Sequence, residues 1–247
     1  MIKDFLDIYQ NRHRYARDWK EKHPNKKMVG YLCTYAPEEL FYAAGILPVR
    51  ILGSHEPQNV TEPHIFGMFC PFSRDVLAQG LQGRYDYLDA VATAHPCMHL
   101  AQVFDSWVLN VTPQSFYVDM PNEVRSPHAL PYLVGVLDEF KERLEEWIGK
   151  EIKEEEIKAA IDVYNENRSL LMQIYEARKA EAPPISGAEA MYITVGSQFM
   201  DKKDSNRLLK EIIEKELPGR EAKQDTDTRL MLVGSEDDDI KFIEMVE

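Results

Sequence analysis

Three cysteines are the side chains with the clearest capacity for metal or redox chemistry in this chain of 247 residues. Cys33, Cys70 and Cys97 each fall at the start of a predicted helix, beside or near a proline. The positive end of a helix dipole favours the thiolate, which is the form of cysteine that ligates metals. In a parallel α/β sheet, strand-to-helix junctions share one edge, and ligands bind there. The placement therefore predicts a metal or cluster site at that edge.

Other polar side chains near the cysteines have two interpretations each. His95 and His99 flank Cys97 and could tune a bound cluster through hydrogen bonds, or could be ordinary polar residues at a helix start. Glu38 and Glu39 could act as paired carboxylates, but a place in the first turn of a helix explains them equally. Three arginines could meet phosphates or could be solvated or ion-paired: Arg50, Arg74 and Arg84.

The segments that position the cysteines alternate between strand-like and helix-like patterns. Strands are predicted over residues 28–32, 47–52, 88–94 and 115–118. Helices are predicted between them, over residues 37–44, 71–81 and 97–109. A proline in the first turn and a glycine after the last turn mark the first two of these helices. The alternation predicts a doubly wound, mostly parallel α/β sheet with helices on its faces.

The chain is predicted to divide into four parts: an N-terminal helix over 1–27, an α/β domain over 28–130, a helical segment over 131–217, and residues 218–247. The last part reads as a polar linker followed by a buried strand, Arg229 to Val233, and a helix with Ser235 as N-cap. One strand and one helix do not form a sheet alone. We therefore expect residues 218–247 to begin a second, truncated α/β domain.

Composition excludes several classes of protein. The formal net charge of −13 opposes nonspecific binding to nucleic acid or to an anionic membrane surface. There is no run of about 18 apolar residues and no signal-peptide pattern at the N-terminus. An odd number of cysteines is atypical of a secreted disulfide framework. The sequence therefore predicts a cytoplasmic protein with reduced thiols.

Two blocks of the predicted α/β domain resemble subunits of the 2-hydroxyacyl-CoA dehydratase and benzoyl-CoA reductase family. The first block is Gly-Tyr-Leu-Cys-Thr-Tyr-Ala-Pro-Glu-Glu-Leu from Gly30, followed by Ala-Ala-Gly-Ile-Leu-Pro-Val-Arg up to Arg50. The second contains Phe-Cys-Pro around Cys70, the run Gly-Arg-Tyr-Asp-Tyr-Leu-Asp from Gly83, and Cys97. The interval of 27 positions from Cys70 to Cys97 also fits the family. Together the blocks cover residues 28–120.

The resemblance implies a [4Fe-4S] cluster held by three cysteine thiolates, with one iron left open for water or a thioester carbonyl. By position, Cys70 and Cys97 match the first two ligands, and the third ligand of the family lies in a C-terminal domain outside this chain. Cys33 is either a further ligand or a small buried thiol beside the site. His95 and His99 are weaker candidates for cofactor contacts.

The resemblance also implies the function. Such a subunit pairs with a homologous second subunit, and a separate ATP-hydrolysing activator sends one low-potential electron to the cluster. The electron drives dehydration of a 2-hydroxyacyl-CoA or ring reduction of benzoyl-CoA. A histidine two residues after Cys97 favours the benzoyl-CoA reductase branch. The sequence has no glycine-rich phosphate loop, so we expect the ATPase to be another chain.

Two alternatives remain open from the sequence. The chain could be a non-catalytic, clusterless remnant or partner subunit of the same family, because two thiolates hold a cluster poorly. Without the resemblance, it would be a generic α/β domain that binds a small molecule. As a fragment of a subunit of this family, the chain is not expected to be active alone.

Overall fold

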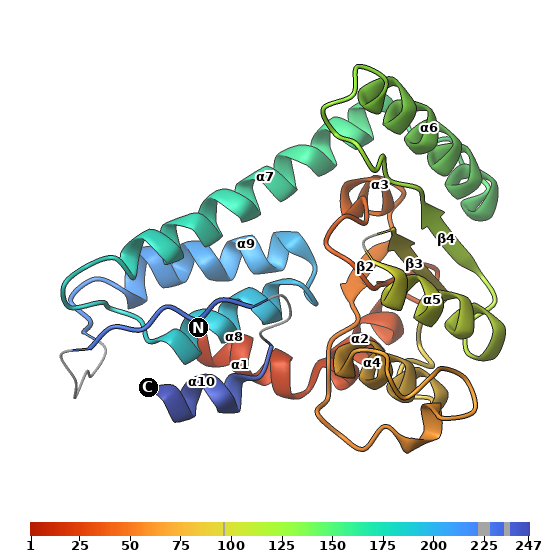
Figure 1. The fold of residues 1–247 in the computed structure, drawn as a ribbon. Coiled ribbons are helices and arrows are strands. Elements are labelled where there is room, and N and C mark those ends of the chain that lie inside the picture. Colours follow the sequence, from red (N-terminus) through yellow and green to blue (C-terminus); the bar gives the residue numbers. More distant parts are fainter. Residues whose placement is uncertain (96, 222–227, 235–237) are drawn as a thin grey trace. The chain divides into compact units, whose positions relative to one another are not determined.

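The structure is a computed structural model that describes residues 1–95, 97–221, 228–234 and 238–247 (Figure 1). It contains two compact units, each with its own core. Unit 1 comprises residues 1–15 and 161–247, and unit 2 comprises residues 16–160. Within the described ranges, no helix is long and apolar enough to cross a membrane.

A four-stranded sheet forms the centre of unit 2. Its strands are β1 (Met28–Tyr31), β2 (Leu47–Arg50), β3 (Ala90–Ala94) and β4 (Ser115–Val118), in the spatial order β2-β1-β3-β4. Each neighbouring pair is parallel, and the register places Tyr31 opposite Arg50 and Ala92. The predicted parallel α/β sheet is confirmed. The chain moves to one side of β1 for β2 and to the other side for β3, so the topological switch point lies between β1 and β3.

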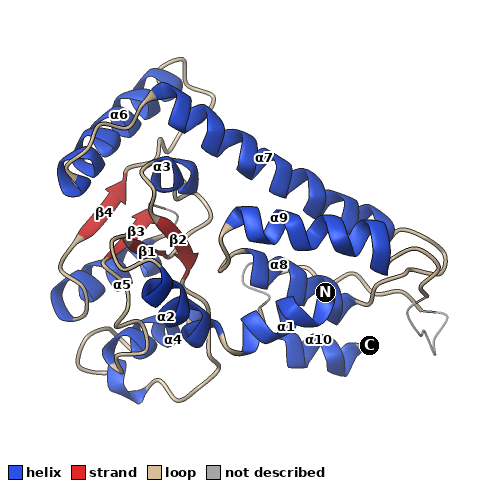
Figure 2. Cartoon of the chain, turned by 180° about the vertical axis from the view of Figure 1, so that it is seen from behind, coloured by secondary structure: helices blue, strands red, loops and turns tan. Residues whose placement is uncertain are grey.

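Helices cover both faces of this sheet, as Figure 2 shows. On one face, α3 (Glu38–Ala43) and α6 (Ala129–Ile148) pack on the strands through three aromatic rings. The ring centroids of Phe41, Phe116 and Phe140 lie 5.3–5.8 Å apart in edge-to-face arrangements. The other face carries α4 (Pro71–Leu81) and α5 (Met98–Asn110). Burial on both faces explains why β1, β2 and β3 consist entirely of buried residues.

The helices α4 and α5 pack side by side, and a glycine makes their close approach feasible (Figure 1). A Cβ atom added at Gly80 would lie 2.8 Å from two ring atoms of Trp107, which is fully buried in α5. Gly80 and Trp107 therefore set the spacing of these two helices. Both helices carry one of the predicted cysteine ligands at the N-terminus.

The remaining elements of unit 2 are the 3₁₀ turn η1 (Asn59–Thr61) and most of α2 (Arg12–Lys22). Unit 1 contains α1 (Ile2–Gln10), α8 (Gly187–Ser197), α9 (Lys202–Glu211), the π-helical turn η2 (Ile212–Glu216) and α10 (Ile240–Val246). Its core is mainly aliphatic, with Ile174, Ile193 and Leu209, and also includes the aromatic ring of Phe5. The unit boundary falls inside α7 (Glu154–Ala177), which contributes residues to both cores.

Two expectations about elements were wrong. The single helix expected over residues 1–27 is two helices, α1 and α2, with Asn11 between them. The buried strand expected over residues 229–233 is not present: these residues are exposed and belong to no strand. A strand forms only when its backbone groups find a partner strand, and an apolar side-chain pattern does not provide one. The expected N-cap Ser235 lies outside the described residues, and α10 is instead capped by Asp239, whose carboxylate accepts the Phe242 N–H at 3.1 Å.

Candidate functional site

Cys70 is the N-cap of α4, as the sequence predicts. Its Sγ accepts a hydrogen bond from the Ser73 N–H at 3.3 Å and lies 2.9 Å from Ser73 Oγ. Pro71 occupies the first helical position, where its missing N–H costs nothing. The cysteine side chain therefore takes the role that Ser or Asp usually has at a helix start. Cys70 is half-buried, and its thiol accepts from the Ser73 N–H and donates to the Ser73 hydroxyl.

Cys97 repeats this geometry on the neighbouring helix. It is the N-cap of α5, and its Sγ accepts a hydrogen bond from the Leu100 N–H at 3.5 Å. The residue is exposed, and it follows β3 by three positions. Both sulfurs therefore sit beside the N–H group of the third helical residue, at the positive end of a helix dipole. Each of them can bind a cation while staying close to its cap position.

His99 joins the two cysteine-bearing segments. It is the second residue of α5, and its Nδ1 accepts a hydrogen bond from the Cys70 N–H at 3.1 Å. The His99 ring also lies against Phe69, with 4.8 Å between ring centroids. Phe69 in turn stacks on Phe66 at 6.5 Å and an interplanar angle of 8°. The structure therefore brings Cys70, Cys97 and His99 into one cluster of segments at the carboxyl edge of the sheet.

His95 belongs to a different set of contacts at this edge. Its Nδ1 lies 3.8 Å from Asp119 Oδ1, and its ring lies 5.8 Å from that of Tyr117. The second oxygen of Asp119 accepts a hydrogen bond from the Tyr132 hydroxyl at 2.6 Å, and this bond raises the pKa of Tyr132. His95 is thus directed to the segment after β4 rather than to Cys70.

Cys33 differs from the other two cysteines. The prediction that it starts a helix was wrong, because α3 begins at Glu38 with Pro37 as its N-cap. Cys33 is a buried free thiol in the turn after β1, where its carbonyl accepts the Ala36 N–H at 3.2 Å. The structure thus places Cys33 after β1 and Cys97 after β3, the two strands that flank the switch point.

A charged cluster lies at the ends of β1 and β2. The Arg50 guanidinium lies 5.6 Å from the centre of the Tyr31 ring, and both side chains are buried. Burial, together with a hydrogen bond to Glu38, raises the pKa of Tyr31 well above its ordinary value. Glu38 and Glu39 stand in the first turn of α3, which is the placement that favours carboxylates at a helix start. Glu38 and Arg50 are therefore engaged with Tyr31 in this structure.

The other two arginines are held by neighbouring segments. Arg84 forms an ion pair with Glu56, and this hydrogen-bonded pairing raises the pKa of Arg84. Arg74 donates from Nη1 to the Gly67 carbonyl at 3.3 Å. Both therefore support the loop that leads to Cys70 and α4. Neither arrangement forms a recognisable phosphate site.

Sequence reasoning missed a buried carboxylate behind the site. Asp75 in α4 accepts hydrogen bonds from the Ser54 N–H at 2.7 Å, the Ser54 hydroxyl at 2.6 Å and the His55 N–H at 2.8 Å. Gln79, one turn later, donates to Asp75 Oδ1 at 3.1 Å and to the Leu52 carbonyl at 2.7 Å. The sequence does carry an indication of this buried pair, because Asp75 and Gln79 are polar residues four positions apart on an otherwise apolar helix face. The pair fixes the loop after β2.

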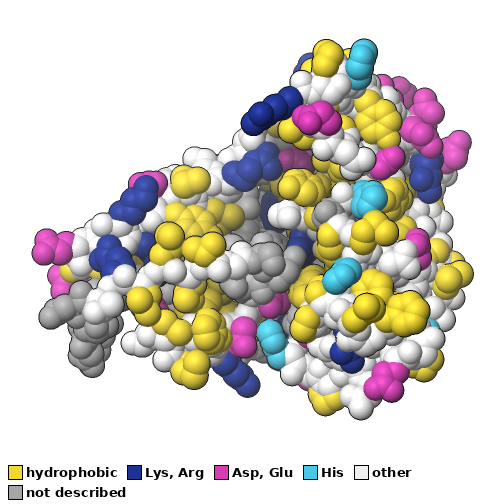
Figure 3. All heavy atoms as spheres, in the orientation of Figure 1, with side chains coloured by type: hydrophobic (Ala, Val, Ile, Leu, Met, Phe, Trp, Pro, Cys, Tyr) yellow, Lys and Arg dark blue, Asp and Glu magenta, His cyan; other side chains and the backbone are white. Residues whose placement is uncertain are grey.

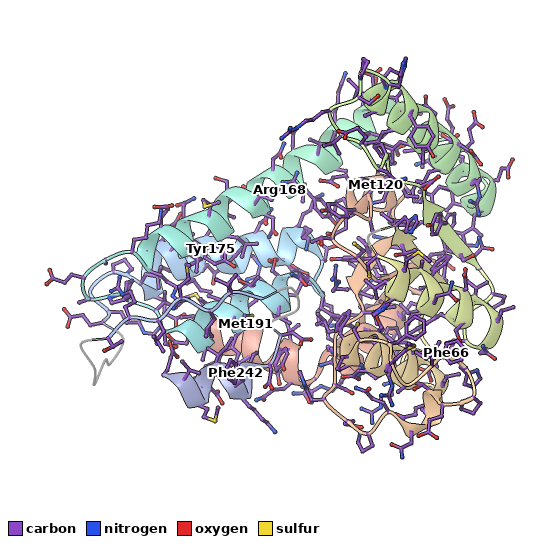
Figure 4. All side chains as sticks on the ribbon, viewed as in Figure 1. Phe66, Met120, Arg168, Tyr175, Met191 and Phe242 are labelled. Atoms are coloured by element: carbon purple, nitrogen blue, oxygen red, sulfur yellow. The ribbon has the colours of Figure 1, made fainter. Side chains whose placement is uncertain are left out.

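Exposed apolar side chains accompany each cysteine in the sequence. Tyr35 is 61% exposed, Met68 is 83% exposed and Met98 is 65% exposed. Phe66, labelled in Figure 4, is 76% exposed. Figure 3 shows apolar side chains and histidines mixed on the face of unit 2 that carries α4 and α5. Such a surface suits an apolar ligand or a protein partner more than it suits bulk water.

No three His, Cys, Asp or Glu side chains converge in the part of the chain that the structure describes. The donor set nevertheless fits a cluster in its chemistry, because two accessible thiols stand at two adjacent helix N-termini with N–H groups already directed at sulfur. The hollow lined by Gly83, Asp89, Asn110 and Gln114 follows α4 and α5, at the opposite edge of the sheet from the cysteines.

The sequence model of the 2-hydroxyglutaryl-CoA dehydratase D-component family matches residues 33–247. The chain belongs to this family. The match includes all three cysteines and extends through the helical part of the chain, so the family assignment made from residues 28–120 is confirmed and widened.

Curated relatives show the same family. The chain is 29% identical over 224 residues to one subunit of the benzoyl-CoA reductase of Thauera aromatica, with 89% of this chain and 58% of the relative covered. It is 24% identical over 247 residues to the (R)-phenyllactyl-CoA dehydratase beta subunit of Clostridium sporogenes, with 100% and 66% covered. A third relative is the beta subunit of (R)-2-hydroxyglutaryl-CoA dehydratase from Acidaminococcus fermentans, 26% identical over 196 residues, with 78% and 52% covered. The chain thus spans between about half and two thirds of their lengths.

Proposed function

We propose that this chain is the iron–sulfur subunit of an ATP-dependent, low-potential CoA-thioester reductase or dehydratase. The observation that carries the proposal is the paired placement of Cys70 and Cys97 as N-caps of the adjacent helices α4 and α5. Family membership supports the class of reaction, since the relatives are named as subunits of benzoyl-CoA reductase and of 2-hydroxyacyl-CoA dehydratases.

Cys70 and Cys97 would hold a [4Fe-4S] cluster, with a further thiolate supplied from outside this chain. When bound, such a cluster supplies one-electron transfer at low potential. The residues of this chain would fix the two thiolates, donate N–H groups to their sulfurs, and present apolar side chains beside them. Cys33, buried after β1, would line the site rather than ligate.

The proposed partners follow from the names of the relatives. Each relative is named as one subunit of an enzyme, which supports a second, homologous subunit for this chain. The ATP-hydrolysing activator would be a separate protein. An acyl-CoA would be the substrate, and the exposed apolar residues Tyr35, Phe66 and Met98 suit an aromatic acyl group such as benzoyl.

The test is anaerobic reconstitution of the full chain with iron, sulfide and an excess of a small thiol, which supplies the further thiolate, followed by iron analysis. We expect the wild type to retain iron, and Cys70→Ser and Cys97→Ser each to lose most of it, because a hydroxyl does not replace a thiolate as an iron ligand. Cys33→Ser is the matched control and should keep wild-type iron content. Equal iron content in the wild type and both ligand variants would contradict the proposed role of Cys70 and Cys97.

A second experiment separates the two branches of the family. The chain is purified with its partner subunit and its activator, then supplied with ATP, reductant and either benzoyl-CoA or a 2-hydroxyacyl-CoA. The 29% identity to a benzoyl-CoA reductase subunit leads us to expect ring reduction. Water loss from the 2-hydroxyacyl-CoA, with no reduction of benzoyl-CoA, would place the chain in the dehydratase branch.

A further inference from the structure

His99 connects the backbone of one cysteine to the helix of the other. It stands on α5, two residues after Cys97, and its Nδ1 accepts the N–H of Cys70 at 3.1 Å. Phe69, the residue before Cys70, packs against the same ring. One side chain from the Cys97 segment therefore holds two consecutive residues of the Cys70 segment.

The hydrogen bond replaces a local cap that α4 lacks. In a capping box, the third helical residue returns a carboxylate to the N–H of the N-cap, as Glu189 does for Ser186 at 3.1 Å in α8. At α4 the third helical residue is Ser73, whose hydroxyl and N–H both lie at the Cys70 sulfur. The acceptor for the Cys70 N–H therefore comes from α5, as the His99 ring nitrogen. A contact that is local in α8 becomes a link between two helices at α4.

The close contact of Gly80 with Trp107 sets the spacing of α4 and α5 at a point distant from their N-termini. This contact lies nine residues along α4 from Pro71, which is about 14 Å at 1.5 Å per residue. His99 acts at the other end of the helix pair. It contacts the Cys70 backbone directly and stands two residues after Cys97 in the sequence. The His99 side chain has only two rotatable bonds, and its contact with the Phe69 ring restricts the orientation of the imidazole further.

We propose that His99 is a positioning residue that fixes the separation of the Cys70 and Cys97 sulfurs by joining the N-cap of α4 to the first turn of α5. The inference rests on the proposed function, in which these sulfurs hold a metal together. Because Nδ1 of His99 accepts the hydrogen bond, it carries no hydrogen, and the neutral ring then has its hydrogen on Nε2. This tautomer is a consequence of the geometry that can be measured without any metal.

The test uses two substitutions and a control on the metal-free full chain. Asn places Oδ1 where His has Nδ1, so His99→Asn keeps the acceptor; His99→Leu has similar bulk and no acceptor. His128, exposed at the start of α6, provides the control His128→Leu. Nitrogen NMR gives the wild-type tautomer, amide exchange reports the Cys70 N–H, and titration with Co²⁺ alone, followed by thiolate-to-metal absorption, reports the two sulfurs.

We expect the Nε2–H tautomer in the wild type, and slow Cys70 amide exchange in the wild type, His99→Asn and His128→Leu. His99→Leu should expose the Cys70 amide to exchange and weaken Co²⁺ binding about 10- to 100-fold, as loss of a residue that orients a ligand does. His99→Asn should bind Co²⁺ nearly as well as the wild type, which a purely space-filling role would not require.

Three results would overturn the inference. They are an Nδ1–H tautomer in the wild type, wild-type exchange and Co²⁺ affinity in His99→Leu, or equal losses in His99→Leu and His99→Asn. Failure of Co²⁺ to bind any protein, with Cys70 exchange still dependent on an acceptor at position 99, would instead contradict the proposed function and uphold the positioning contact. The tautomer measurement needs no substitution, so a variant that fails to fold leaves the test intact.

Discussion

At the scale of single residues, Asp75 shows how a buried charge shapes the edge of the sheet that carries the site. A carboxylate only accepts hydrogen bonds, and Asp75 receives four, from Ser54 twice, His55 and Gln79. The loop that it holds includes His55 at a φ of 57°, a conformation that non-glycine residues rarely adopt. The hydrogen bonds to Asp75 therefore offset local backbone strain in the segment after β2.

Replacing Asp75 with Asn should destabilise the fold. The amide group of Asn would turn one acceptor into a donor: with its oxygen on the N–H groups of Ser54 and His55, its NH₂ would face the Gln79 Nε2 group that donates to the other oxygen of Asp75. The unmet donors should lower the free energy of unfolding by about 1–3 kcal/mol, measured by urea denaturation. Asp138→Asn, at an exposed position of α6, should change it by less than about 0.5 kcal/mol. Similar losses in both variants would show that Asp75 has no special role.

The residues of the candidate site differ in whether the neighbouring sequence was enough to predict their positions. A cysteine beside a proline is visible in the sequence, and the placement of Cys70 and Cys97 at helix starts was predicted correctly. The contacts of His99 and Asp75 join residues 29 and 20 to 21 positions apart, and no local pattern indicates such pairings. Cys33 lacked a helix start because the turn after β1 runs on to Glu38 before the backbone becomes helical.

At the scale of secondary-structure elements, the pairing of α4 and α5 depends on a missing side chain. Gly80→Ala would gain about 1 kcal/mol from helix propensity, but its Cβ would lie 2.8 Å from rigid ring atoms of Trp107. Overpacking a core costs about 1–3 kcal/mol, so the net effect should be a loss of about 1 kcal/mol in unfolding free energy. The measurement is urea unfolding followed by circular dichroism.

Gly135 in α6 is the matched control, because no atom lies within 4 Å of a Cβ built there. Gly135→Ala should therefore stabilise the chain by about 0.5–1 kcal/mol through propensity alone. If both alanine variants were stabilising, the close approach of α4 and α5 at Gly80 would be disproved. The comparison separates packing between helices from the preference of a single helix.

Elements with strong end signals were predicted well from the sequence. Pro71 and Gly83 bound α4, and β4 was expected over the four residues where it occurs. One local break was missed: Asn11 interrupts the N-terminal helix, and its side-chain amide donates to Asp7 Oδ1 at 2.7 Å. An element that would depend on a distant partner was predicted wrongly. Residues 229–233 have an apolar strand-like pattern, but no described strand pairs with them.

At the scale of the whole molecule, two electrostatic effects on the carboxyl groups determine how stability depends on pH. Pairing with lysine favours the ionised carboxylate, whereas the large negative net charge disfavours it. Lys141 holds Glu145 at 2.5 Å and Lys210 holds Glu166 at 2.5 Å, one pair in each unit. These bonds lower the pKa of Glu145 and of Glu166 below the ordinary 4.5. The net charge of −13 acts in the opposite sense, since protonation relieves repulsion. At 0.15 M salt, repulsion between distant charges is screened within about 8 Å, whereas the direct pairs persist.

Stability should therefore fall as the solution becomes acidic. A carboxylate whose pKa is lower in the folded state contributes stability above its unfolded pKa, near 4.5 here, and this contribution is lost as pH falls through the folded pKa. Urea unfolding at 0.15 M salt should give a plateau from pH 7 to about pH 5 and a decline below about pH 4.5. Glu145→Gln should make that decline shallower, because its group no longer titrates, while Glu146→Gln, exposed on the same helix, should keep the wild-type slope. An unchanged slope in Glu145→Gln would show that the bonds from Lys141 and from the Ile152 N–H do not couple folding to pH.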